Sequence, residues 1–161
     1  MLLPASKRRI QAVEGTYVIV AAEYNRPYVD GMLAAARRIF RSAGARRLQV
    51  IRVPGAFEIP VVAAELASSD VHPPAAILCL GLIVRGATAH ADHIGEAVTS
   101  ALQSLQCQTR VPIIHEVLLV GDLEQARERC RSRSHNRGAE GAQTALAMAA
   151  CLRNIRRAAS V

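Results

Sequence analysis

Apolar residues along the chain follow two patterns, one typical of buried strands and one typical of amphipathic helices. Strand-like segments occupy 16–25, 47–53 and 111–120, where apolar and β-branched residues dominate over a short length. A fourth segment, AAILCLGLIV at 75–84, contains no charged residue. A continuous apolar run of this kind indicates a strand that is covered on both faces, as in a parallel sheet.

The segments between these strands carry apolar residues at helical spacing. In 28–44 such residues share one helical face, and Gly44 is a natural helix stop. The residues on that face are Met32, Ala35, Ala36, Ile39 and Phe40. The other predicted helices run from the PGAFEIP loop to about Ser69, over 89–106, over 122–131 and over 138–158.

The order of these elements places the chain in the α/β class. Strands alternate with helices through short loops, which requires right-handed crossovers and a parallel sheet. We therefore expect a single three-layer α/β/α sandwich with a four-stranded parallel sheet and a flavodoxin-like order. Residues 1–15 are polar, basic and irregular, so we expect an N-terminal arm there and one domain over 16–161.

Composition narrows the possible function classes. Hydrophobic residues make up 51% of the 161 residues and aromatic residues only 3%, so the core is built from small aliphatic side chains that favour close helix packing. The net charge of +7 fits an anionic substrate or a nucleic acid. Because no aromatic or basic binding motif accompanies the charge, we expect no nucleic-acid partner.

The cysteines and the apolar segments indicate the compartment. The four cysteines form no CxxC pair, which favours reduced thiols over disulfides or a zinc site. No segment has the pattern of a signal peptide, and none approaches the roughly 18–20 apolar residues of a membrane span. We expect a cytoplasmic protein without membrane contact.

Three polar loops follow predicted strands and are candidates for a binding site. They are AAEYNRP, VPGAFEIP and VRGATAHADH. In open parallel sheets, ligands bind beyond the carboxyl ends of the strands, so we expect these loops to lie side by side.

The third loop has features of a phosphate site. Gly86 and Ala87 let backbone N–H groups approach a ligand, and the following helix presents its positive dipole end. Arg85 adds charge, and His90 is suited to proton transfer near neutral pH. The alternative is an ordinary strand-to-helix turn, with Thr88 as the N-cap and His90 merely exposed.

Two further features leave alternatives open. In VPGAFEIP, Phe57 offers an apolar wall, whereas Glu58 is either a site acid or an acid placed at a helix N-terminus by the dipole. The five arginines within 127–137 form either a solvated face or an anion site that spans a subunit boundary. His90 and His93 lack a third ligand at the spacing that zinc requires, so we expect no metal.

Taken together, these stretches resemble the lumazine synthase family of riboflavin biosynthesis. The matching pieces occur in family order and span about residues 16–150. They are Tyr24-Asn25, VPGAFEIP at 53–60, GLIVRGATAHADH at 81–93, VPII at 111–114, LEQARER at 123–129 and NRGAEGA at 136–142.

The resemblance implies a transferase. The family condenses 5-amino-6-ribitylaminouracil with 3,4-dihydroxy-2-butanone 4-phosphate: an imine forms, phosphate leaves, and the ring closes to 6,7-dimethyl-8-ribityllumazine. It implies no metal or organic cofactor, these two small-molecule substrates, and a homo-oligomer of at least five subunits. Since the linker 130–136 lacks the Gly-Lys pattern common in shell-forming members, we expect a pentamer or a pair of pentamers, with the helix at 89–106 lining the axis.

The resemblance also assigns residues to the ring-binding half of the site. Tyr24 stands where the family has an aromatic that stacks on the pyrimidine. Residues 56–58 match the segment that binds the ribityl chain and the ring, and 82–84 match the strand end that packs on the ring. His115 stands where many members have a phenylalanine supplied by a neighbouring subunit. The ring-binding residues implied are Tyr24, Asn25, Ala56, Phe57, Glu58, Leu82, Ile83, Val84 and His115.

The phosphate-binding half is implied in the same way. The turn formed by Gly86, Ala87 and Thr88 receives the phosphate beside Arg85, and His90 matches the proton-transfer histidine. Arg129 matches an arginine that a neighbouring subunit supplies to the phosphate. Arg137 is implied as a substrate-binding residue without a place in either half, and it replaces a common lysine and keeps its charge. The residues LVGD at 119–122 depart from the family's threonine-rich segment, and Ala91 replaces a common aromatic.

Three alternatives to the enzyme remain at this point. A non-catalytic pentameric scaffold or ligand-binding relative of the same fold would explain His115 and the altered residues 119–122. A flavodoxin-like module for a ligand such as FMN would need aromatic loop residues, and the chain has only two Phe and three Tyr. A nucleic-acid binder would use the arginines of 127–137 and would show a steep salt dependence.

Overall fold

The computed structural model of the chain describes residues 10–69 and 71–159. The greater part of the expected N-terminal arm, residues 1–9, lies outside the described residues. Of the remainder, Val13 is buried, and the Ala12 amide donates a hydrogen bond of 2.8 Å to the Ala43 carbonyl. This short segment therefore packs on the domain.

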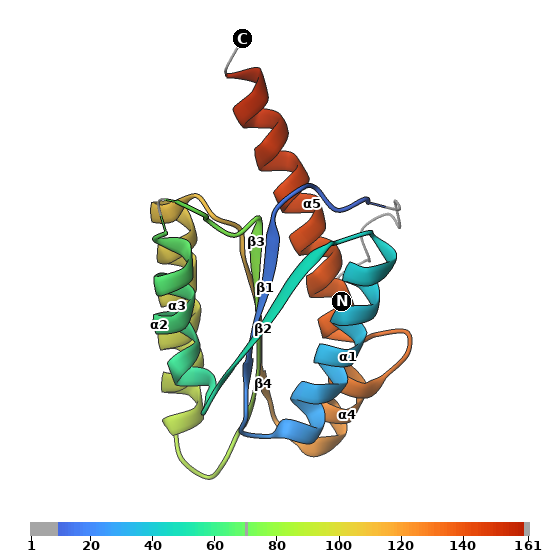
Figure 1. The fold of residues 1–161 in the computed structure, drawn as a ribbon. Coiled ribbons are helices and arrows are strands. Elements are labelled where there is room, and N and C mark those ends of the chain that lie inside the picture. The colour runs from blue at the N-terminus through green and yellow to red at the C-terminus, as the bar shows by residue number, and fades with distance from the viewer. Residues whose placement is uncertain (1–9, 70, 160–161) are drawn as a thin grey trace.

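A four-stranded parallel sheet forms the middle layer, as expected from the apolar runs (Figure 1). Its strands are β1 (Thr16–Ala22), β2 (Arg47–Val53), β3 (Ala76–Val84) and β4 (Ile113–Val120). They are arranged in the order β2-β1-β3-β4, so β2 and β4 form the two edges. The uncharged strand β3 is central and is buried along nearly its whole length, which explains why it carries no polar position.

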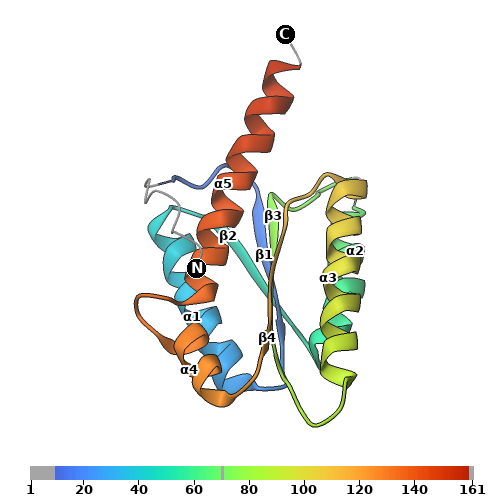
Figure 2. The same ribbon diagram turned by 180° about the vertical axis from the view of Figure 1, so that it is seen from behind.

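Helices cover both faces of this sheet, which confirms the three-layer α/β/α prediction. On one face lie α1 (Arg26–Ser42), α4 (Leu123–Arg131) and α5 (Arg137–Ala158), and on the other α2 (Ile59–Ala67) and α3 (His90–Thr109). Figure 2 shows the same arrangement from behind, with α5 continuing beyond the amino ends of the strands. A short 3-10 helix, η1 (Ala56–Glu58), occupies part of the PGAFEIP segment predicted as a loop.

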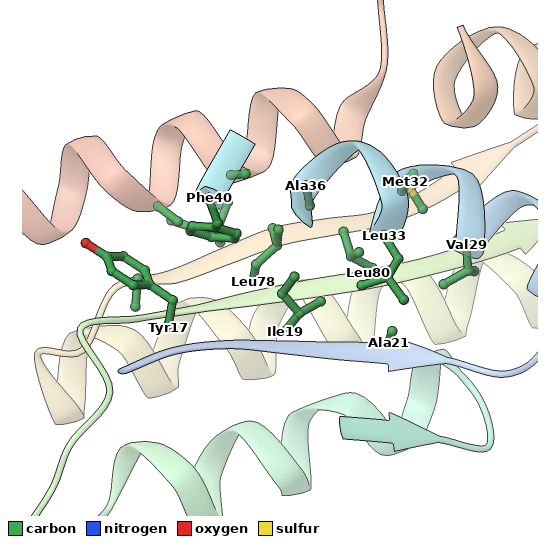
Figure 3. Packing of buried hydrophobic residues seen from close by; sticks show 14 of the residues in the cluster. Tyr17, Ile19, Ala21, Val29, Met32, Leu33, Ala36, Phe40, Leu78 and Leu80 are labelled. Atoms are coloured by element: carbon green, nitrogen blue, oxygen red, sulfur yellow. The ribbon is translucent and has the colours of Figure 1, made fainter. Parts of the chain in front are cut away.

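The core is aliphatic, and the helices approach the sheet closely. Figure 3 shows β1 residues such as Ile19 and β3 residues such as Leu78 packed under α1. The rings of Tyr17 and Phe40 lie 5.1 Å apart at one end of this layer. A Cβ at Gly138 in α5 would collide with the backbone of Met32 in α1. The glycine therefore sets how near these two helices lie.

A glycine or a capping side chain marks several of the helix ends. Gly44 has φ +78° just after α1, as expected for a helix stop. The Asn136 side chain caps α5 by accepting from the amides of Gly138 and Ala139, at 3.0 and 3.3 Å. Asp122 caps α4 in the same way.

All four cysteines are described and are free thiols. No helix in the described ranges is long and apolar enough to cross a membrane.

Candidate active site

A cavity of about 620 Å³ opens at the carboxyl ends of β1 and β3, between η1 and the start of α3. All three candidate loops contribute to it, as predicted from the parallel sheet. Its lining residues are Tyr24, Asn25, Gly55, Ala56, Phe57, Glu58, Leu82, Ile83, Val84, Gly86, Thr88, His90, Ala91 and Ile94. Most of the implied ring-binding and phosphate-binding residues therefore face one cavity.

Backbone and amide hydrogen bonds join the first two loops to the central strand. The amide of Tyr24 donates to the Pro54 carbonyl at 3.0 Å, which ties the β1 loop to the β2 loop. The Asn25 Nδ2 donates to the Leu82 carbonyl at 2.8 Å, which ties the same loop to β3. Asn25 adopts φ +57°, a left-handed conformation that asparagine tolerates better than most residues.

Gly55 allows the mouth of the cavity to form. A Cβ at this position would lie 2.8 Å from the Glu58 Oε2 and 2.9 Å from a ring carbon of Tyr24. Only a glycine lets both side chains lie over the turn. Tyr24 and Phe57 are 72% and 61% exposed. Two aromatic side chains are thus available to contact a ligand at the entrance.

The interior of the cavity is apolar on the side of β3. Leu82 and Ile83 are buried, and Val84 and Ile94 are half-buried beside them. Such a surface packs against a planar ring, while polar groups at the rim set its orientation. Glu58 is half-buried and is the carboxylate among the lining residues. It also stands at the start of α2, so both interpretations of this residue fit its position.

The turn between β3 and α3 is open and exposed. A Cβ at Gly86 would meet no heavy atom of the described residues within 4 Å, so a ligand can approach the backbone there. The Arg85 guanidinium pairs with Asp92 at 2.6 Å and is 52% exposed. Ala87 lies in the same exposed turn, although it is not among the lining residues.

His90 is the first residue of α3, is exposed, and lines the cavity. The alternative in which Thr88 is the N-cap is wrong, because the helix starts one residue later than that arrangement requires. Ala89 occupies the N-cap, and in the described chain no side chain caps this helix. The first amides of α3 therefore remain available beside the cavity. No cluster of three potential metal ligands occurs among residues 10–69 and 71–159.

Three implied site residues lie elsewhere, along the edge strand β4 and the helices beside it. They are His115 on β4, Arg129 on α4 and Arg137 at the start of α5. The His115 Nε2 lies 2.9 Å from the Thr99 Oγ1 of α3. Burial lowers the pKa of His115, which favours a neutral imidazole. We call these residues, together with Glu116, the β4-edge group.

Glu116 was not predicted from the sequence. Its side chain is 6% exposed, and its Oε2 accepts from the Arg137 Nε at 2.9 Å. Burial raises the pKa of Glu116 to about 7, and the nearby Glu140 carboxylate adds to this, whereas Arg137 and Arg129 oppose it. The available signal was one acid inside the apolar run VPIIHEVLLV, since a buried charge requires a partner.

Comparison with known proteins gives a consistent result. The sequence profile of the family described as 6,7-dimethyl-8-ribityllumazine synthase matches residues 15–153. A protein of that name from Kineococcus radiotolerans is 39% identical over 139 residues, covering 85% of this chain and 84% of the relative. Another from Xylella fastidiosa is 38% identical over 141 residues, covering 86% of this chain and 90% of the relative.

Proposed function

The chain belongs to the 6,7-dimethyl-8-ribityllumazine synthase family, and we propose that the cavity at the carboxyl ends of β1 and β3 is its active site. The activity is the transferase step of riboflavin biosynthesis that condenses 5-amino-6-ribitylaminouracil with 3,4-dihydroxy-2-butanone 4-phosphate. The observation that carries the site assignment is that Tyr24, the 55–58 turn, the end of β3 and His90 line one cavity.

The ring half of the cavity holds the ribitylaminouracil. Tyr24 and Phe57 contact its faces at the entrance, and Leu82, Ile83 and Val84 form the apolar wall. Glu58 and the amide of Asn25 lie among the polar groups that orient the ring and its ribityl chain. Because both reactants are bound side by side, the attack of the amine on the ketone becomes effectively unimolecular.

The phosphate half of the cavity holds the butanone phosphate. Its phosphate sits on the turn from Arg85 to Thr88, against the uncapped start of α3. His90 assists the proton transfers as water and phosphate leave, because it stands at the cavity wall and an imidazole can both accept and donate a proton.

A second copy of the chain completes the site. Arg129, Arg137 and His115 are implied substrate contacts, yet they lie along the β4 edge rather than around the cavity of their own chain. We assign them to the cavity of a neighbouring subunit, in a ring of five. Helix α3 is a suitable inner wall for such a ring because it exposes small residues such as Ala97 and Ala101.

The test is a turnover assay with both substrates, followed by lumazine absorbance against the slow uncatalysed condensation. Arg129→Ala removes a cation that stabilises the departing phosphate, so kcat/KM should fall by about 100-fold. Arg37→Ala is the matched control, because Arg37 is an exposed arginine of α1 outside the cavity and the β4-edge group. A folded oligomer that does not accelerate the reaction would overturn the proposal.

A further inference from the structure

The environment of Glu116 is built around its carboxylate. The residue lies in β4, paired in register with Leu80, and its side chain faces α5. A Cβ at Gly141 of α5 would lie 2.7 Å from the Glu116 Cγ and 2.7 Å from Leu78. The glycine in α5 therefore leaves the space that the glutamate occupies, and the helix lies close enough to cover it.

The Arg137 guanidinium is oriented by two carboxylates. Its Nε donates to Glu116 at 2.9 Å and its Nη1 donates to Glu140 at 2.6 Å. Within the described part of the chain, its remaining nitrogen, Nη2, has no hydrogen-bond partner. The side chain is still 32% exposed. The arginine is thus held on one side and open on the other.

The backbone that carries Arg137 is also anchored. The adjacent residue, Asn136, is buried, and its Nδ2 donates to the Cys130 carbonyl at 2.7 Å. Its Oδ1 caps the first turn of α5. Since both ends of the Arg137 side chain are constrained, the direction of its free nitrogen is set by Glu116 rather than by the flexibility of the chain.

We infer that Glu116 is a positioning residue for the condensation: its buried carboxylate holds the Arg137 guanidinium at the β4 edge, with Nη2 presented to the phosphate bound by a second copy of the chain. The inference rests on the function proposed above. A buried acid paired with one arginine contributes little net stability. The burial of Glu116 is therefore explained by its effect on the orientation of the Arg137 guanidinium.

The experiment measures KM for each substrate separately in Glu116→Ala, Arg137→Ala and the double variant. Each single variant should raise KM for the butanone phosphate about tenfold and leave KM for the ribitylaminouracil unchanged. The double variant should match Arg137→Ala, because Glu116 acts only through that arginine. Glu116→Gln keeps a hydrogen-bond acceptor for Nε and should stay near the wild-type KM.

Controls separate positioning from folding. Glu65→Gln, an exposed acid of α2, should leave both KM values unchanged. If Glu116→Ala does not fold, Glu116→Leu fills the space of the glutamate side chain without a hydrogen-bond acceptor. It should give the same rise in KM for the butanone phosphate. An unchanged KM for the phosphate substrate, a parallel rise for both substrates, or an effect of Glu116→Ala that persists without Arg137 would overturn the inference. An inactive wild type would instead overturn the proposed function, and this inference with it.

Discussion

The cavity and the β4-edge group differ in polarity and in how their side chains are held. The cavity is lined largely by apolar side chains, and Tyr24 and Phe57 at its entrance are exposed. In the β4-edge group, hydrogen bonds hold the Arg137 guanidinium against Glu116 and Glu140, and His115 lies within hydrogen-bond distance of Thr99. In the function proposed above, the apolar cavity contacts the ring and the β4-edge group supplies cations to the cavity of a neighbouring subunit.

Subunit complementation tests whether the cavity of one chain and the β4-edge group of another form one site, and the largest effect is expected there. In the function proposed above, His90→Ala removes the proton-transfer group of the cavity and Arg129→Ala removes a cation of the β4-edge group, so each variant alone should lose about 100-fold in kcat. When the two are unfolded together and reassembled in equal amounts, a fraction of sites receives both intact halves. Activity should recover to roughly a quarter of wild type, as random pairing of neighbours predicts.

Recovery in that assay depends on mixed assembly. Reassembling each variant by itself is the control and should give no recovery. If the mixture stays as inactive as its components while forming mixed oligomers, the two regions do not share a site.

The second prediction concerns stability and pH at Glu116. The pKa of this residue is raised from 4.5 to about 7 by burial, so the folded state holds a proton more tightly than the unfolded state does. Its contribution to stability is complete below pH 4.5 and is lost as pH rises through about 7. The free energy of unfolding should fall by roughly 2–3 kcal/mol over this range.

Urea unfolding at several pH values measures this dependence, and Glu116→Gln should remove it. The charged neighbours in α4 and α5, namely Arg129, Arg137 and Glu140, remain in that variant. A pH dependence of equal size in Glu116→Gln would assign it to other groups.

The third prediction, with the smallest expected effect, tests whether the mouth of the cavity at Gly55 belongs to the ring half. Gly55→Ala places a methyl group against Glu58 and the Tyr24 ring, so both must shift. KM for the ribitylaminouracil should rise about fivefold, with little change for the butanone phosphate. Gly121→Ala is the control, because its Cβ would meet only the Gln125 side chain, at 3.4 Å. Equal effects on both substrates would contradict the division of the cavity into two halves.

The sequence and the resemblance pointed to most lining residues of the cavity and to His115, Arg129 and Arg137 of the β4-edge group, but not to Glu116 or to the contacts that hold these residues. Periodicity and uncharged runs such as 75–84 locate strands, and the parallel order then brings three loops to one edge. The bond from Asn25 to Leu82 and the pair of His115 with Thr99 depend on register between elements distant in sequence. The alternative in which Thr88 caps α3 was wrong because a helix start is fixed within one residue by backbone angles that local composition does not specify.

Asn25 links the two halves of the cavity mechanically. Its side chain holds the end of β3, while its backbone carbonyl accepts the first hydrogen bonds of α1, from the amides of Tyr28 and Val29. The loop that carries Tyr24 and the strand that leads into the turn at 85–88 are therefore joined at one residue. Because the cavity walls are tied together in this way, a ligand that binds there should cost the chain little conformational entropy.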